Sequence, residues 1–352
     1  MAPTSLLYAQ DNAQEAARSS VASGAVSQGA RRTKVVILAT GGTIAGVGEE
    51  GKSTGYASGQ LSVDDLLKDV PQLSQVADVE AYQVCNVNSD DITAPIWLDL
   101  ARTIDDMSLR SDVTGFVVTH GTDTMDETAY FLNLALKTGK PVVVTGSMRP
   151  STATSADGPM NLYQAVVTAA AAESRAKGVL VAFSGRLYNA RDVQKTSTHS
   201  MTTMSGGENG SCGTIRDDKI FYTSQTTKLH TGHTEFDVSE LVDLPKVSVL
   251  YFNVDADPDL IAFAAQRSQG LVIAGAGGGE FSQRFARAIA ALDIPVVVSS
   301  RVGSGVIMSS TMVCKNAIPG NDLPPMKAAV LLRLALTVTQ NPALIARMFD
   351  VY

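Results

Sequence analysis

The feature that most constrains the fold of this chain is a set of short, continuous apolar runs. Continuous rather than alternating runs are typical of strands that are buried on both faces of a parallel sheet. We therefore expect seven buried strands, at residues 35–39, 115–119, 141–145, 178–183, 247–252, 271–274 and 295–299.

Helix-start signals lie between these runs. Thr124-Met-Asp-Glu127 has the spacing of a capping box and predicts a helix that continues to Leu136. Asp157-Gly-Pro159 places an N-cap residue before a first-turn proline and predicts a helix to Ala176. Strands that alternate with helices indicate an α/β fold.

The length of 352 residues favours two domains. Residues 1–33 are rich in Ala, Ser, Gln and Gly and are expected to form a disordered tail, or to hold the remnant of an export signal in SLLYAQ (5–10). The polar segment around His230 and His233 reads as a linker with a solvated histidine pair rather than a metal site. The expected division is a larger N-terminal domain at 34–222, a linker at 223–244 and a smaller α/β domain at 245–352.

Composition argues against several classes of function. The net charge is −7 and no dense Lys/Arg run occurs, so we expect no nucleic-acid partner. No apolar stretch has membrane-spanning length, so we expect no membrane partner. Cys85, Cys212 and Cys314 lie far apart without CxxC spacing, which favours free or core thiols. We expect neither a metal nor another cofactor.

Hydroxyl-bearing loops follow three of the predicted strands. The loops are Thr40-Gly-Gly-Thr43, Thr119-His-Gly-Thr-Asp123 and Thr145-Gly-Ser-Met-Arg-Pro150. In a parallel sheet these loops gather at one edge, where open α/β proteins bind ligands. Several hydroxyls and one carboxylate should therefore lie in a single crevice.

The residue types in these loops limit the kinds of chemistry that they can support. A phosphate cradle would need a nearby lysine, and GGTIAG does not fit GxGxxG. The GxSxG motif of serine hydrolases is absent. A threonine nucleophile would need a base, for which Tyr56, Asp123 and Lys195 are candidates. Gly41, Gly42 and Gly121 would let backbone amides approach an oxyanion.

The combination of motifs resembles a known family. TGGTIAG, HGTDTMDETAYFL and SMRPSTATSADGPMNLYQAV are similar to the motifs of the bacterial L-asparaginases, the two-threonine amidohydrolases. The resemblance is closest to the exported type II branch, and it extends from Lys34 to Tyr352. It implies a larger, flavodoxin-like N-terminal domain with a mainly parallel sheet and a smaller C-terminal α/β domain.

The resemblance implies catalytic roles. Thr43 would be the nucleophile that attacks the side-chain amide and forms a β-acyl-enzyme. Tyr56, in a glycine-rich lid at 45–60, would help to activate Thr43. Thr122, Asp123 and Lys195 would form the second catalytic group, in which Lys195 eases deprotonation of Thr122.

The resemblance also implies a substrate-binding set. Asp123 would bind the α-ammonium group, Ser89 the α-carboxylate, and Ser147 would lie near the amide. The full set is Gly42, Ser89, Asp90, Gly121, Thr122, Asp123, Ser147 and Asp255.

Two positions depart from the family pattern. Asp90 stands where relatives commonly carry Gln or Glu. The glutamate that a neighbouring subunit normally contributes is missing, since residues 299–320 hold no acidic residue and Thr311 falls near its place. Asp255 matches the other residue that is contributed across the interface. The resemblance therefore implies a homotetramer built from two intimate dimers.

The expected function is hydrolysis of L-asparagine to L-aspartate and ammonia, with L-glutamine as a second candidate substrate. A glutaminase-dominant enzyme is one alternative. A catalytically impaired amino-acid-binding relative and a nucleotide-binding α/β protein are two others. We expect export to the periplasm, with the cytoplasm as the alternative.

Overall fold

The larger sheet is mainly parallel and has eight strands within residues 33–352, the part of the chain that the computed structural model describes. The strand order is β10-β9-β6-β5-β4-β3-β1-β2, and the strands from β2 to β5 in that order are parallel neighbours. The strands are β1 (Lys34–Gly41), β2 (Asp78–Val87), β3 (Val113–Thr119), β4 (Val142–Thr145), β5 (Val179–Phe183), β6 (Arg186–Asn189), β9 (Gly213–Arg216) and β10 (Lys219–Tyr222).

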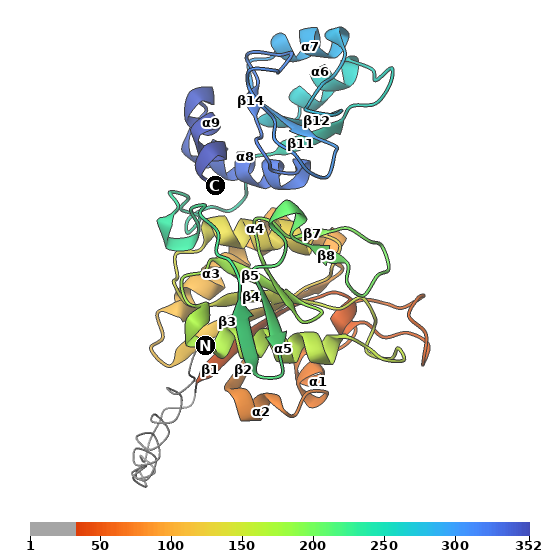
Figure 1. Ribbon diagram of the computed structural model, residues 1–352, viewed down its shortest axis with the longest axis vertical. Helices are drawn as coiled ribbons and strands as arrows, with labels where there is room; N and C mark the ends of the chain where they lie inside the picture. The colour runs from red at the N-terminus through yellow and green to blue at the C-terminus, as the bar shows by residue number, and fades with distance from the viewer. Residues whose placement is uncertain (1–32) are drawn as a thin grey trace, which may run out of the picture. The chain divides into compact units, whose positions relative to one another are not determined.

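Helices cover both faces of this sheet (Figure 1). The helices on the two faces are α3 (Ala94–Ser108) and α4 (Met125–Ala135) on one side, and α1 (Val63–Lys68), α2 (Leu73–Val76) and α5 (Gly158–Ala170) on the other. Successive side chains of one strand point to opposite faces. Val36 and Leu38 accordingly join the core beneath α3 and α4, whereas Val35 and Ile37 join the core beneath α5.

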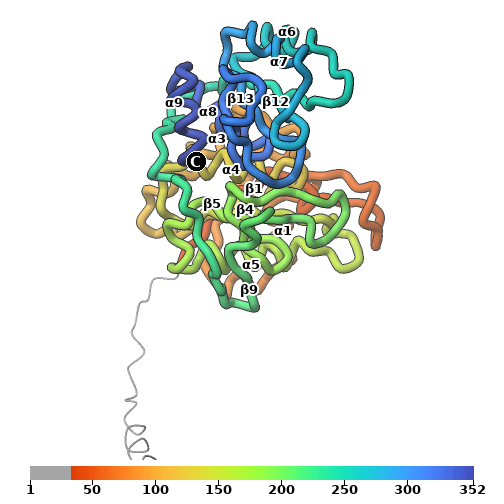
Figure 2. The backbone as a smooth tube through the Cα atoms, turned by 45° about the horizontal axis from the view of Figure 1, so that its top comes forward, coloured from red at the N-terminus to blue at the C-terminus, as the bar shows by residue number. Residues whose placement is uncertain are grey.

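A second, smaller parallel sheet follows in the C-terminal part of the chain, in the order β11-β12-β13-β14. Figure 2 shows α6 and α7 beside its strands. The elements are β11 (Val247–Tyr251), β12 (Gly270–Gly275), β13 (Val296–Ser300), β14 (Ile318–Pro319), α6 (Asp259–Ala265), α7 (Gln283–Ala290), α8 (Pro325–Val338) and α9 (Pro342–Val351). The predicted α/β class with a larger and a smaller sheet is confirmed, as are all seven predicted strands.

Short elements connect these layers. The antiparallel pair β7 (Gln194–Lys195) and β8 (Met204–Ser205) stands outside both sheets. The short 3-10 turns are η1 (Thr43–Ala45), η2 (Ser89–Asp91), η3 (Ala172–Ser174), η4 (Gly207–Asn209) and η5 (Thr231–His233). The predicted tail or export signal lies outside the described residues, apart from Thr33.

Three local predictions are wrong. Thr124 does precede α4, but its hydroxyl donates to the Ser89 carbonyl at 2.7 Å and makes no capping bond, because a tertiary acceptor competes for it. The helix that starts after Asp157 ends at Ala170 rather than Ala176. His230 is buried rather than solvated, although His233 is exposed.

Candidate active site

The three hydroxyl-bearing loops begin side by side. Ala39 pairs with Thr119 between β1 and β3, and Thr119 pairs with Thr145 between β3 and β4. The carboxyl ends of these parallel strands therefore meet at one edge, as the sequence predicts.

The first two loops pack backbone against backbone at Gly42. Its φ of 83° lies in the left-handed region that favours glycine. A Cβ atom at this position would lie 2.3 Å from the main-chain nitrogen of Gly121. Glycine is therefore required at residue 42, and this contact joins the loop of Thr43 to the loop of Thr122.

Thr43 begins the η1 turn and is 7% exposed. Its hydroxyl lies 2.8 Å from the Tyr56 hydroxyl, and either group can be the donor. A hydroxyl nucleophile needs a partner that accepts its proton. Tyr56 is in position to be that partner.

The segment that carries Tyr56 is held at its base by main-chain contacts. Val47 and Ala57 form a β-bridge across it, and the Gly48 main-chain N–H donates to the Thr152 hydroxyl at 3.1 Å. A Cβ atom on Gly48 would lie 2.8 Å from that of Tyr56. Figure 2 shows this segment as the red-orange loop at the side of the tube. The glycines thus allow the loop to close tightly around Tyr56.

Thr122, Asp123 and Lys195 form a second cluster. The Lys195 ammonium donates to the Thr122 hydroxyl at 2.9 Å and to the Asp123 carboxylate at 2.6 Å. Thr122 is 4% exposed, whereas the Asp123 side chain is 62% exposed. A cation beside a buried hydroxyl lowers the cost of deprotonating that hydroxyl, and the exposed carboxylate can bind a cationic group of a ligand.

Ser89 contributes a buried hydroxyl to the same region. Among the described residues its Oγ has no hydrogen-bond partner. A Cβ atom on Gly121 would lie 2.7 Å from this oxygen, so Ser89 borders the loop of Thr122. Buried hydroxyls are normally paired, and an unpaired one beside catalytic candidates indicates a place where a ligand binds.

Ser147 and Asp90 make no side-chain hydrogen bond to Thr43, Tyr56, Thr122, Asp123 or Lys195 among residues 33–352. Ser147 is fully buried and donates to the Arg149 carbonyl at 2.8 Å. The carboxylate of Asp157 accepts the main-chain N–H groups of Met148 and Arg149, each at 3.0 Å, and so shapes this loop. Asp90 is exposed within the η2 turn.

Asp255 and Thr311 are not joined to either cluster by hydrogen bonds among residues 33–352. The Asp255 side chain is 89% exposed and lies 3.7 Å from Arg284. Thr311 is exposed and donates to the Met308 carbonyl at 3.0 Å.

His120 is a buried residue that the sequence did not single out. The Gly121 carbonyl can only accept, so His120 Nδ1 donates to it at 2.7 Å and Nε2 accepts from the Thr128 hydroxyl at 2.9 Å. Trp97 Nε1 donates to the same hydroxyl at 2.8 Å. Burial lowers the pKa of His120 to about 4, so the ring is neutral at pH 7. This chain of bonds fixes the orientation of the Gly121 carbonyl.

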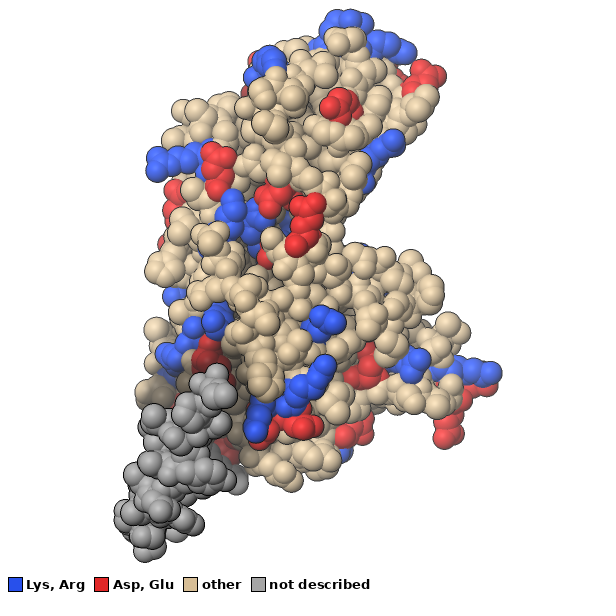
Figure 3. Space-filling model, in the orientation of Figure 1, with Lys and Arg blue, Asp and Glu red and all other residues tan. Residues whose placement is uncertain are grey.

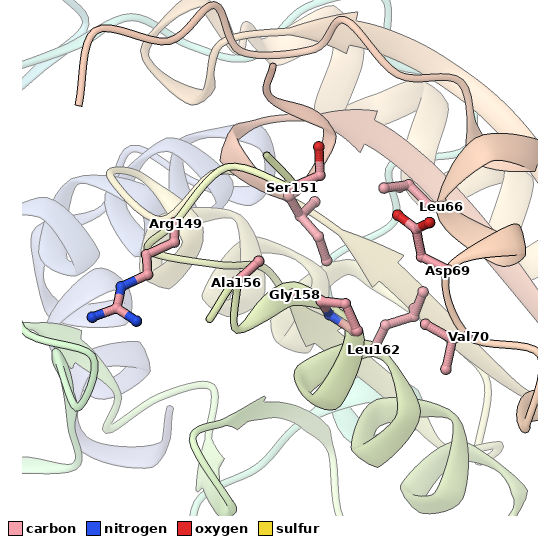
Figure 4. A pocket seen from close by; sticks show the side chains of 10 residues that line it. Leu66, Asp69, Val70, Arg149, Ser151, Ala156, Gly158 and Leu162 are labelled. Carbon is pink, nitrogen blue, oxygen red and sulfur yellow. The ribbon is translucent and has the colours of Figure 1, made fainter. Parts of the chain in front are cut away.

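A small cavity lies between Leu66, Val70, Gly158 and Leu162 (Figure 4). Its volume is about 10 Å³, and Ile44, Leu66, Val70 and Leu162 are among the residues that line it. In Figure 4 the Arg149 side chain extends away from it. A space of this size holds one water molecule at most, so it is a packing gap and not a substrate site.

Residues 33–352 contain no cluster of three or more His, Cys, Asp or Glu that could hold a metal ion. Within the same range, no helix combines the length and the apolar character that crossing a bilayer requires. Cys85, Cys212 and Cys314 are free thiols, as predicted. Basic and acidic side chains are interspersed over the described residues on the face shown in Figure 3.

The family models that match the chain cover most of residues 33–352. Residues 34–228 match the family model "Asparaginase, N-terminal" and residues 246–349 match "Glutaminase/Asparaginase C-terminal domain". The chain is 43% identical to L-asparaginase 2 of Bacillus subtilis, across 94% of this chain and 90% of that protein. It is 42% identical to a probable periplasmic L-asparaginase of Haemophilus influenzae, across 92% and 95%.

A solved structure is similar as well. The crystal structure of a probable cytoplasmic L-asparaginase from Campylobacter jejuni matches with a TM-score of 0.88 and 42% identity. The match covers 91% of this chain and all of that one. The compartments in these two names differ, so periplasmic export of the present chain stays a prediction.

Proposed function

This chain belongs to the asparaginase family of amidohydrolases, close to the bacterial type II L-asparaginases, and from that premise we propose that it hydrolyses L-asparagine through a threonine acyl-enzyme. The products are L-aspartate and ammonia. The observation that carries this proposal is the 2.8 Å contact between the buried Thr43 hydroxyl and Tyr56.

In the first half-reaction the Thr43 oxygen attacks the side-chain amide carbon of asparagine, and its proton passes to the Tyr56 hydroxyl, which in turn gives its own proton to the leaving amide nitrogen. The resulting oxyanion is stabilised by main-chain N–H groups that Gly42 and Gly121 allow to approach closely. The C–N bond then breaks, the amide nitrogen takes up a proton and ammonia leaves. An ester between Thr43 and the substrate's β-carbonyl remains.

In the second half-reaction water attacks this ester. Thr122, polarised by the Lys195 ammonium at 2.9 Å, orients the water, and the proton that the water loses passes to the Thr43 oxygen as the ester C–O bond breaks. Collapse of the second oxyanion releases L-aspartate and restores Thr43. The closed segment around Tyr56 limits access of bulk water during both steps.

Substrate orientation comes from groups at the opposite end of the amino acid. Asp123 binds the α-ammonium group as a charge-assisted pair, with Asp90 as a second acceptor. The unpaired Ser89 hydroxyl binds the α-carboxylate. Ser147 lies near the amide, and Asp255 of one subunit approaches the site of its neighbour.

L-glutamine is the second substrate that we propose. Its side chain is longer by one methylene, a difference that apolar discrimination alone resolves only about 10–200-fold. The family description that matches residues 246–349 names both activities, which supports this extension. We also propose that residues 34–222 form the catalytic domain and that the enzyme is a homotetramer of two intimate dimers.

The test is release of ammonia from L-asparagine and from L-glutamine by the purified chain. We expect turnover of asparagine and slower turnover of glutamine. Faster glutamine hydrolysis would favour the glutaminase-dominant alternative. Tight calorimetric binding of asparagine without any ammonia would instead identify an amino-acid-binding protein and contradict the enzyme.

A further inference from the structure

The strand that carries Lys195 is short and pairs with one other short strand. Lys195 lies in β7, which has two residues and pairs with the equally short β8. Its side chain must nevertheless reach both Thr122 and Asp123. Other contacts must therefore hold the backbone that leads to Lys195.

One such contact comes from Lys327 in α8, in the C-terminal part of the chain. Lys327 is 1% exposed, and its ammonium donates to the carbonyls of Ala190, Arg191 and Val193 at 2.7, 2.8 and 2.5 Å. These bonds use all three ammonium donors. A buried ammonium is tolerated only when it is hydrogen-bonded, and without it three buried carbonyls would lose their partner.

The side chain of Arg191 fastens the same segment a second time. Its guanidinium makes a bidentate pair with Asp322, with N–O distances of 2.8 and 2.6 Å. Its Nε also donates to the Tyr352 carbonyl at 3.0 Å. Residues 190–193 are thus attached to the C-terminal part of the chain through both main chain and side chain.

Asp126 holds Lys195 from the other side. The Lys195 main-chain N–H faces the Asp126 carboxylate and favours its charged form, against the rise in the pKa of Asp126 that burial causes. Asp126 lies in the first turn of α4, directly after the loop that contains Thr122 and Asp123. One short stretch of chain therefore contacts both the backbone of Lys195 and its ammonium group.

We propose that Lys327 and Asp126 are positioning residues that fix Lys195 against Thr122, and that they act on catalysis only through Lys195. This inference rests on the proposed function. It also makes α8 of the C-terminal region part of the catalytic apparatus, although no residue of α8 is expected to touch the substrate.

The first test compares Lys327→Met with wild type in steady-state asparagine hydrolysis. A displacement of about 1 Å can cost about 100-fold in rate, so we expect kcat to fall by about 10–100-fold while KM changes by less than about threefold. Lys140→Met is the matched control, because its ammonium also donates to a main-chain carbonyl, that of Arg110 at 2.6 Å. It should retain wild-type kcat. A folded Lys327→Met enzyme with wild-type kcat would overturn the proposal.

A double-mutant cycle with Lys195→Met separates positioning from general damage. If Lys327 acts only through Lys195, Lys327→Met should change kcat by less than about twofold in the Lys195→Met background. A structural defect would instead lower kcat by the same factor in both backgrounds. That additive result would contradict the proposal.

Asp126 provides a test that does not depend on either lysine variant. Asp126→Asn keeps an oxygen that can accept the Lys195 N–H and should retain kcat within about threefold, whereas Asp126→Ala should lose about tenfold or more. Equal kcat values for the two variants would overturn the proposal, including where Lys327→Met does not fold. Absence of ammonia release by the wild type would instead contradict the proposed function itself.

Discussion

The hydroxyl groups of Thr43 and Tyr56 lie 2.8 Å apart, although 13 positions separate the two residues. The contact exists because the intervening chain folds back on itself through the bridge between Val47 and Ala57. The glycine-rich loop at residues 45–60 therefore places the Tyr56 hydroxyl beside the buried Thr43 hydroxyl. In the proposed mechanism the Tyr56 oxygen receives the nucleophile's proton.

Tyr56→Phe should remove this proton acceptor and leave the ring packing intact. General base catalysis contributes about 10²–10⁴-fold, and we expect kcat for asparagine to fall within that range with a smaller change in KM. Tyr82→Phe is the control, because Tyr82 also bonds to a side chain, that of Glu80, on the exposed edge strand. Steady-state kinetics of both variants decide the matter, and an unchanged kcat in Tyr56→Phe would exclude the role of Tyr56.

His120 should make the protein less stable at mildly acidic pH. Burial lowers its pKa to about 4, so between about pH 6.5 and 4 the unfolded chain binds a proton that the folded chain does not. Its contribution to the free energy of unfolding should therefore fall by about 2 kcal/mol between pH 7 and pH 5. Glu127, whose pKa burial raises to about 7, acts in the opposite direction.

The contribution of His120 is isolated by comparing slopes of stability against pH. Between pH 7 and pH 5 the urea-unfolding free energy of His120→Asn should rise by about 2 kcal/mol relative to that of the wild type, whereas the exposed His199→Asn should leave the wild-type slope unchanged. Identical slopes in wild type and His120→Asn would contradict the buried neutral imidazole.

The family resemblance implies that Thr311 lies near the position at which relatives contribute a glutamate to the neighbouring subunit. Thr311→Glu should restore a negative charge near the α-ammonium site and raise kcat/KM for asparagine by about tenfold, equivalent to 1.4 kcal/mol. Thr311→Gln has the same size without the charge and should produce a smaller change. Unchanged kcat/KM values for both asparagine and glutamine in Thr311→Glu would refute this assignment.

The enzyme should be a tetramer in solution. The family resemblance implies that a neighbouring subunit contributes residues to the site, and Asp255 and Thr311, which lie at or near such positions, are exposed. Light scattering coupled to size-exclusion chromatography should give the mass of four chains. A catalytically active monomer at assay concentration would contradict the shared site.

The sequence predicted the buried strands well, because a short continuous apolar run is stable only where both of its faces are buried. It did not predict β2, whose residues are mostly half-buried or exposed, since an edge strand carries no such pattern. Thr124 was wrongly assigned to a capping box because the competing acceptor, the Ser89 carbonyl, lies 35 positions away. A capping signal consists of neighbouring residues, but the hydrogen-bond partners that compete with it can lie far away in the sequence.

Some residues of the site could be identified from the sequence, and others only from the tertiary structure. The strand-end loops containing Thr43 and Thr122 could be identified from the sequence, because each follows a recognisable strand. Their roles came from the family resemblance. Lys327 was missed because a lysine in a helix ordinarily lies at the surface, and only the tertiary structure brings three carbonyls to its ammonium group.

The most direct test of the central claim is ammonia release from L-asparagine by Thr43→Ala measured beside the wild type. The account predicts steady turnover by the wild type and a loss of at least about 10³-fold in the variant, because the variant lacks the hydroxyl that pairs with Tyr56. Turnover by Thr43→Ala at a rate near that of the wild type would contradict the assignment of Thr43 as the nucleophile.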